Sequence, residues 1–184
     1  MKKKAVFLDR DGVINIDTSY IKSPDELTLY PFSAQAIKQL NKAGYIVVVV
    51  TNQSVIARNM CTEHTLGLIH KKLEIELKKE DAYINKLYYC PHHPDGDREN
   101  KDNPYVKECE CRKPKAGMLF QAKEDFNIDF SESFMVGDSE CDIQAGITAG
   151  VKTIGVKTGN AVKGKIKPDY IVKDLLEAIK IILK

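Results

Sequence analysis

The 184-residue sequence predicts a doubly wound, mainly parallel α/β sheet flanked by helices. Strand-like apolar runs alternate with helical stretches along the chain, which is the pattern of repeated strand–helix–strand units. Two of these runs, at 5–8 and 45–50, are continuously apolar, as strands covered on both faces are. Neither a repeat nor a linker interrupts the alternation, so we expect one domain over residues 1–184.

Local signals set the expected elements in order. After the first strand, Ser33 is expected to cap a helix that ends at Gly44, and 45–50 is the central strand. Leucine and isoleucine recur at helical spacing over 62–80, with lysines on the outer face. The remaining expected elements are a strand at 87–89, a polar loop at 91–110, a helix at 116–126, a strand at 134–136, a helix ending near 149, strands at 153–156 and 170–172, and a C-terminal helix capped by Asp174.

Composition narrows the class of protein. The sequence is 43% hydrophobic and 29% charged, as soluble globular proteins are. A net charge of +2 and a pI near 8.2 are too mild to indicate a nucleic-acid or membrane partner. No run approaches the ~20 apolar residues of a membrane-spanning helix, and no signal peptide is recognisable. We therefore expect a cytoplasmic protein that acts on a small molecule.

Polar side chains follow three of the predicted strands: Asp9 and Asp11; Thr51 and Asn52; and Asp138, with Asp142 one helical turn later. Because ligands bind at the carboxyl ends of parallel strands, these residues suit one site better than solvated acidic turns. Clustered carboxylates without imidazole favour Mg²⁺, which also neutralises an approaching phosphate. One Asp could attack phosphorus to form an aspartyl-phosphate, while another protonates the leaving oxygen and later activates water.

A second group of potential ligands lies within 90–111: Cys90, His92, His93, Cys109 and Cys111. Three thiols and one imidazole can form a closed tetrahedral site, and thiolates select Zn²⁺ over Mg²⁺. A closed site leaves no position for substrate, so we expect a structural zinc that clamps the long loop. The alternative is a set of reduced cysteines without metal. The spacing does not choose between His92 and His93, and Cys61 and Cys141 stand apart from the group.

Four motifs occur in register: Asp9-x-Asp11-Gly12, Thr51-Asn52, Lys113-Pro114 and Gly137-Asp138-x-x-x-Asp142. Together they resemble the haloacid dehalogenase superfamily of phosphatases. Over roughly residues 4–160, the chain is similar to the heptose bisphosphate phosphatases within that superfamily. This resemblance implies a Rossmann-like fold without a separate cap domain and a place in heptose and lipopolysaccharide biosynthesis. It implies Mg²⁺-dependent removal of the 7-phosphate of D-glycero-D-manno-heptose 1,7-bisphosphate, which leaves the heptose 1-phosphate. We expect a monomer, because compact folds with closed catalytic crevices often work as monomers.

The same resemblance implies a role for each catalytic residue. Asp9 would be the nucleophile and a Mg²⁺ ligand. Asp11 would be the general acid/base and would hold Mg²⁺ through its backbone carbonyl, and Asp138 would complete the protein ligands. Thr51 and Lys113 would bind the transferring phosphoryl group.

Other roles implied by the resemblance lie around this centre. Asp142 would orient the metal-binding loop or a metal-bound water, and His92 rather than His93 would complete the zinc site. The expected substrate-side residues are Asp17, Ser19, Tyr20, Asn52, Gln53, Ser54 and Arg112. For all of these, the alternative role is helix capping or hydrogen bonding within loops.

The chain departs from the family pattern at three positions. Val55 and Asn59 stand where glycines are usual, and a β-branched residue does not readily adopt positive φ, so this loop is expected to run differently. Ser139 replaces a common lysine. The resemblance also extends to histidinol-phosphate phosphatases, which remain an alternative substrate class. A zinc-stabilised binding or scaffold protein without activity is the alternative of another class.

Overall fold

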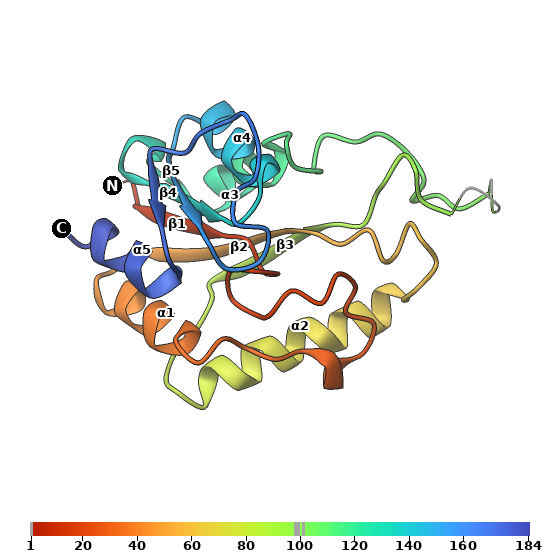
Figure 1. Cartoon of the computed structure of the whole chain (residues 1–184), viewed down its shortest axis with the longest axis horizontal. Coiled ribbons are helices and arrows are strands. Elements are labelled where there is room, and N and C mark those ends of the chain that lie inside the picture. The colour runs from red at the N-terminus through yellow and green to blue at the C-terminus, as the bar shows by residue number, and fades with distance from the viewer. Residues whose placement is uncertain (1, 98–99, 101) are drawn as a thin grey trace.

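The computed structural model describes residues 2–97, 100 and 102–184, so part of the 91–110 loop lies outside the described residues. A six-stranded sheet with the order β3-β2-β1-β4-β5-β6 forms its centre (Figure 1). All neighbouring strands are parallel. The strands are β1 (Ala5–Leu8), β2 (Ile46–Asn52), β3 (Lys86–Cys90), β4 (Phe134–Gly137), β5 (Lys152–Val156) and β6 (Tyr170–Val172). The predicted fold class is confirmed.

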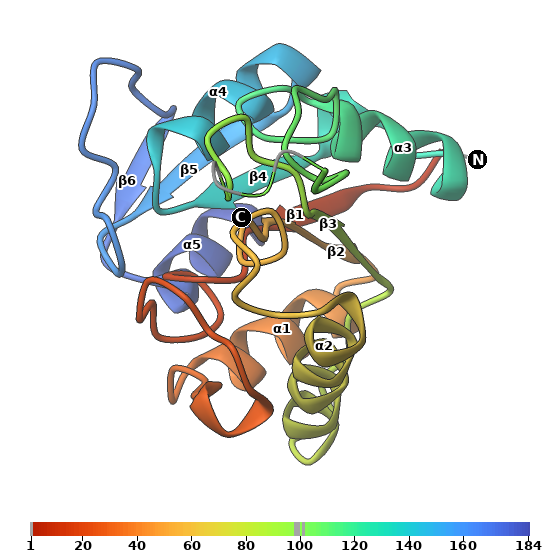
Figure 2. The same cartoon turned by 90° about the vertical axis from the view of Figure 1, so that its right-hand side faces the viewer.

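Helices cover both faces of this sheet (Figure 2). One face carries α1 (Ser33–Lys42), α2 (Glu63–Lys78) and α5 (Leu175–Ile182), and the other carries α3 (Gly117–Phe126) and α4 (Glu140–Ala149). Short 3₁₀ helices occur at η1 (Pro24–Glu26) and η2 (Phe130–Glu132). No separate cap domain is seen among the described residues. None of the described helices is both long enough and apolar enough to cross a membrane.

The central strand β1 shows why the chain forms three layers. All four of its side chains are buried. Val6 and Leu8 belong to the core beneath α1, α2 and α5, whereas Ala5 and Phe7 belong to the core beneath α3 and α4. Successive side chains of a strand point to opposite faces, so an apolar residue at every position requires cover on both sides.

The expected helix ends are mostly confirmed. Thr62 caps α2 by accepting a hydrogen bond from the Thr65 backbone N–H, and Asp174 caps α5 through the Glu177 N–H. The expected cap at Ser33 is wrong, because Ser33 is the first residue inside α1. Its buried hydroxyl donates to the Ile14 carbonyl oxygen at 2.6 Å instead, which attaches α1 to the loop after β1.

Candidate active site

Three carboxylates meet where β1 and β4 end. Asp9 directly follows β1, Asp138 directly follows β4, and Asp142 lies in the first turn of α4. The Asp9 backbone N–H donates to the Val136 carbonyl oxygen at 3.0 Å, which fixes the two strand ends beside each other. One carboxylate oxygen from each acid lies within 4.8 Å of the others, and all three side chains are largely buried. Such a cluster requires positive charge.

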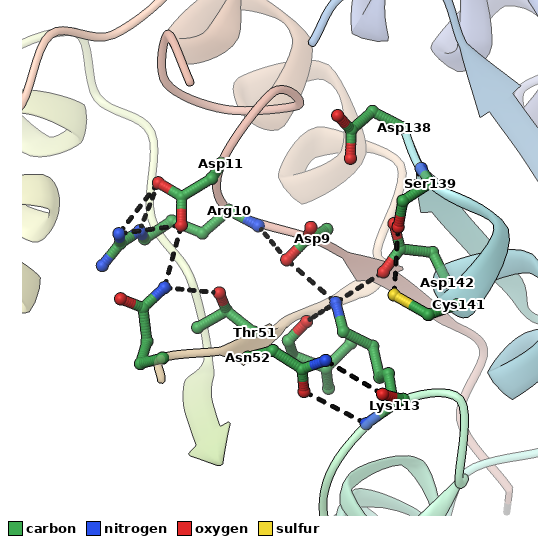
Figure 3. Close-up of polar contacts among 12 residues, drawn as sticks. Asp9, Arg10, Asp11, Thr51, Asn52, Lys113, Asp138, Ser139, Cys141 and Asp142 are labelled. Atoms are coloured by element: carbon green, nitrogen blue, oxygen red, sulfur yellow. Dashed lines mark hydrogen bonds and ion pairs between the residues drawn. The ribbon is translucent and has the colours of Figure 1, made fainter. Parts of the chain in front are cut away.

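Lys113 supplies part of that charge (Figure 3). Its ammonium lies 2.9 Å from Asp9 Oδ1 and 2.6 Å from Asp142 Oδ1, and it donates to the Val50 carbonyl oxygen at 2.7 Å. The Asn52 side chain positions Lys113 by accepting from its backbone N–H at 3.1 Å and donating to its carbonyl oxygen at 3.0 Å. The end of β2 therefore positions a lysine that is 61 residues later in the chain.

The pKa values indicate that one ammonium does not neutralise the cluster. Burial raises the pKa of Asp9, Lys113 lowers it, and the Asp142 and Asp138 carboxylates raise it further, to about 8. Burial also raises the pKa of Asp138 to about 6, despite hydrogen bonds from Asn160. Burial would lower the pKa of Lys113, but the Asp142 and Asp9 carboxylates outweigh it and raise that pKa. A divalent cation beside Asp9 and Asp138 would favour their ionised forms.

Both carboxylate oxygens of Asp142 make polar contacts. Its Oδ1 lies against Lys113, while its Oδ2 accepts from the Ser139 N–H at 3.1 Å and from the Ser139 hydroxyl at 2.5 Å. This arrangement suits a residue that orients Lys113 and the turn after β4; the contact with Lys113 was not among the roles expected for Asp142. Ser139, where the family pattern has lysine, thus begins α4 with a capping box.

Asp11 lies on the other side of Asp9 from Asp138 (Figure 3). Its carboxylate accepts hydrogen bonds from Arg10, Asn15 and Gln53. Burial alone would raise the pKa of Asp11, but the Arg10 charge and these hydrogen bonds outweigh burial and lower it. The Gln53 amide also donates to Thr51 Oγ1 at 2.9 Å, so it connects Asp11 with the end of β2.

The predicted substrate-side residues divide into two groups. Asn52 and Gln53 belong to the hydrogen-bond network around Lys113 and Asp11. Among the described residues, no hydrogen bond joins Asp17, Ser19, Tyr20, Ser54 or Arg112 to the three buried carboxylates. These five residues are placed by their own loops: Asp17 accepts from the Ser19 N–H, Tyr20 lies beneath Arg58, the Ser54 carbonyl accepts from the Arg58 N–H, and Arg112 donates to the His92 carbonyl.

The cysteine cluster converges as expected. The Sγ atom of Cys90 lies 3.4 Å from that of Cys109 and 3.1 Å from that of Cys111, and Cys109 and Cys111 are 3.4 Å apart. His92 Nδ1 is 3.4 Å from Cys111 Sγ. Zinc–sulfur bonds of about 2.3 Å imply sulfur–sulfur distances of about 3.8 Å, so a small expansion would admit the ion. Of the two histidines, His92 is the one in this group, whereas His93 Nε2 lies 3.5 Å from Arg58.

Sequence reasoning missed several residues that support the site. Arg10 and Asn15 bond to Asp11, and the backbone and side chain of Asn160 donate to Asp138 Oδ2 at 2.6 and 3.0 Å. A charged residue between two acids normally indicates a solvated turn, and Asn160 lies in a loop with no periodic pattern. Arg10 and Asn15 are distinguished by their burial, and Asn160 by its contact with a residue 22 positions earlier, neither of which a local pattern reports.

The structure accommodates both residues that stand where glycines are usual. Val55 is buried in the core without positive φ, and Asn59 adopts φ of 56°, which Asn tolerates, so the Val55 side chain is accommodated by packing. Cys141 stands apart from the zinc group, as expected, and its Sγ is 3.1 Å from Ser139 Oγ. Burial and the Asp142 charge raise the pKa of Cys141 to about 11, so it remains a thiol at neutral pH.

The turn after β1 also requires a glycine. Gly12 has φ of +77°, and a Cβ there would lie 2.4 Å from Asp138 Oδ2. Only glycine allows the backbone to pass this close to the carboxylate.

The parallel sheet, the buried acids at its carboxyl edge and the lysine between them define a haloacid dehalogenase-like hydrolase. In agreement, the family model described as HAD-hydrolase-like matches residues 110–178. The chain belongs to the D-glycero-beta-D-manno-heptose-1,7-bisphosphate 7-phosphatase family. It is 43% identical to the protein of that name from Haemophilus ducreyi over 97% of this chain and 98% of the relative. It is 38% identical to the protein of the same name from Escherichia coli (strain K12), over 96% of this chain and 93% of the relative.

Solved structures agree with this placement. The D,D-heptose 1,7-bisphosphate phosphatase from B. bronchiseptica, complexed with magnesium and phosphate, matches with a TM-score of 0.87 and 35% identity over 98% of each chain. The corresponding phosphatase from Burkholderia thailandensis matches with a TM-score of 0.73 and 32% identity over 99% of each chain.

Proposed function

We propose that this protein is a Mg²⁺-dependent phosphomonoesterase that removes the 7-phosphate of D-glycero-D-manno-heptose 1,7-bisphosphate and leaves the 1-phosphate. The observation that carries this proposal is the buried cluster of Asp9, Asp138 and Asp142 around Lys113. Similarity to the named phosphatases over nearly the whole chain supports the substrate. Phosphorylated sugars do not cross membranes unaided, so we place the reaction in the cytoplasm.

The arrangement assigns a task to each side chain. The Asp9 carboxylate attacks phosphorus and forms an aspartyl-phosphate, while Thr51 and Lys113 hold the oxygens of the transferring group. Asp11, which its donors hold ionised in the free protein, takes up a proton from solvent and passes it to the leaving sugar oxygen. It then removes a proton from the water that hydrolyses the aspartyl-phosphate.

The donor set fits a hard cation. Asp9, Asp138 and the backbone carbonyl of Asp11 would hold Mg²⁺, which would supply charge neutralisation for the phosphate. Asn160 orients Asp138 through two hydrogen bonds, and Asp142 orients Lys113. We further propose a structural Zn²⁺ at Cys90, His92, Cys109 and Cys111.

The sugar side is expected to involve the loops that end near Tyr20, Ser54 and Arg112. Two cations lie beside neighbouring histidines there: Arg58 Nη2 is 3.5 Å from His93 Nε2, and Arg112 Nη1 donates to the His92 carbonyl oxygen at 3.1 Å. Such a surface suits a substrate that carries negative charge. Asp17 and Ser19 remain proposed sugar contacts.

Phosphate release tests the assignment. The protein is assayed with both anomers of heptose 1,7-bisphosphate and with histidinol phosphate, with and without Mg²⁺. We expect turnover of a heptose bisphosphate that requires Mg²⁺ and is lost in Asp9→Asn. Asp81→Asn, which changes an exposed acid, is the matched control and should retain activity. Faster turnover of histidinol phosphate would contradict the substrate, and full activity of Asp9→Asn would contradict the nucleophile.

A further inference from the structure

Arg10 lies between the two acids of the first motif and contacts both. Its backbone N–H donates to Asp9 Oδ1 at 2.7 Å. Its guanidinium Nη2 lies 2.8 Å from Asp11 Oδ1 and 2.9 Å from Asp11 Oδ2, and Nε donates to Oδ1 at 3.2 Å. One residue therefore fixes the nucleophile through its backbone and the second acid through its side chain.

Two amides complete the contacts of Asp11. Asn15 Nδ2 donates to Oδ1 at 2.9 Å, and Gln53 Nε2 donates to Oδ2 at 2.8 Å. We call Arg10, Asn15 and Gln53 the Asp11 cradle. Every one of these contacts comes from a donor, so the cradle holds both carboxylate oxygens in a defined direction.

The burial of Arg10 shows that this contact is specific. Arg10 is 1% exposed and is the largest of the fully buried side chains. A buried guanidinium needs a paired charge, and among the described residues the only ion pair of Arg10 is with Asp11. His70 brings no further charge, because burial and the Arg10 guanidinium lower its pKa to about 3 and keep it neutral.

We propose that Arg10 is a positioning residue that sets the orientation of Asp11 for proton transfer and affects the reaction only through Asp11. This inference rests on the proposed function, in which Asp11 donates a proton to the leaving oxygen and later takes one from water. A small error in the position of such a group reduces the rate without removing the binding site. Asn15 supports the same orientation through its own hydrogen bond to Asp11 Oδ1.

A double-mutant cycle distinguishes this role from a general structural one. We would measure kcat and KM for Arg10→Lys, Asp11→Asn and the double variant with heptose bisphosphate. Lysine keeps the charge but lacks the two-pronged geometry of arginine. We expect Arg10→Lys to lower kcat roughly tenfold to hundredfold while KM changes less than about twofold. In the Asp11→Asn background the same substitution should change kcat less than about twofold, because its route of action is already removed.

A second substrate gives an independent readout. p-Nitrophenolate leaves without protonation, so formation of the aspartyl-phosphate from p-nitrophenyl phosphate does not need the acid function of Asp11. We expect Arg10→Lys to slow the first chemical step far less with this ester than with an alkyl phosphate. Equal losses in the Asp11 and Asp11→Asn backgrounds, or a change in KM alone, would overturn the proposal.

Two controls keep the test decisive. Lys38→Ala changes an exposed ion pair far from the acids and should have no effect in either background. If Arg10→Lys does not fold, Asn15→Ala removes a different member of the cradle and should show the same dependence on Asp11. If the protein hydrolyses an alkyl phosphate such as glycerol phosphate but not heptose bisphosphate, the substrate assignment fails. The cycle with glycerol phosphate then still tests Arg10.

Discussion

At the scale of single residues, Lys113 is the side chain on which most of the buried charge depends. It is 2% exposed and contacts Asp9 and Asp142, which come from different elements. Removing one partner from a buried ion pair leaves an uncompensated charge, which costs far more than the loss of an exposed pair. The lysine expected to bind phosphate therefore also stabilises the fold.

We predict that Lys113→Met lowers the free energy of unfolding by roughly 3–5 kcal/mol at neutral pH without Mg²⁺. The matched control is Lys115→Met, two residues later, which removes an exposed ion pair with Glu110. It should change the free energy of unfolding by less than about 1 kcal/mol. Urea unfolding of both variants measures the difference. Mg²⁺ should restore part of the stability lost in Lys113→Met, since its charge can compensate that of the Asp9 carboxylate. Equal effects of the two substitutions would contradict this account.

At the scale of elements, α2 carries a buried histidine that is not part of the proposed chemistry. Burial, followed by the charge of Arg10, lowers the pKa of His70 from 6.5 to about 3. The unfolded chain therefore binds a proton at a pH where the folded protein does not. Its contribution to stability is present above about pH 6.5 and is lost as the pH falls toward 3.

His70→Gln should remove this dependence. Between about pH 6.5 and pH 4, the free energy of unfolding should fall less steeply in the variant than in the native protein, by up to ~1.4 kcal/mol per pH unit. His64 lies on the same helix but is exposed, so His64→Gln should leave the native slope. Chemical denaturation at several pH values measures all three proteins. A native slope in His70→Gln would show that the histidine is protonated in the folded state.

The proposed zinc clamp joins the end of β3 to the segment before α3. Because Cys111 precedes Arg112 and Lys113, loss of the clamp should disturb the proposed site as well as the loop. We predict that Cys111→Ser loses bound zinc, unfolds at a lower temperature and is cleaved faster by proteases within 91–110. Cys61 lies outside the cluster, so Cys61→Ser should retain zinc. Elemental analysis checks this, and unchanged zinc in Cys111→Ser would contradict the ligand assignment.

Elements with strong local patterns were predictable from the sequence. The buried strand 45–50, the helix over 62–80 and the cap at Asp174 follow from periodicity and capping chemistry. The role of Ser33 was not predictable, because its buried hydroxyl donates to the distant Ile14 carbonyl oxygen and does not cap the helix. Asn160 was missed for a related reason, because only a tertiary contact brings its loop to Asp138. Arg10 was missed because its contact with the adjacent Asp11 depends on burial, which the sequence around it does not indicate.

At the scale of the whole molecule, the acids at the carboxyl edge oppose folding until a cation joins them. Asp9 and Asp138 follow strands that pair in the centre of the sheet, so the site cannot relieve their repulsion by moving apart. Burial raises the pKa of Asp138 to about 6. The stability that this protonation contributes is present below about pH 4 and is lost as the pH rises through 6. Through Asp138, folding without metal is therefore less favoured at neutral pH than below about pH 4.

Mg²⁺ should consequently raise the melting temperature of the whole domain. At a concentration of about 100 times its dissociation constant, a ligand specific to the folded state adds about 2.7 kcal/mol, which corresponds to roughly 5–10 °C for a chain of this size. The shift should shrink below about pH 6, because the ion must then displace a proton from Asp138. Asp138→Asn should abolish most of the shift. Asp129→Asn changes a partly exposed acid at the start of η2 and should keep the shift in melting temperature. Thermal unfolding with and without Mg²⁺ at pH 5 and pH 7.5 measures each case, and a shift that persists in Asp138→Asn would place the ion elsewhere.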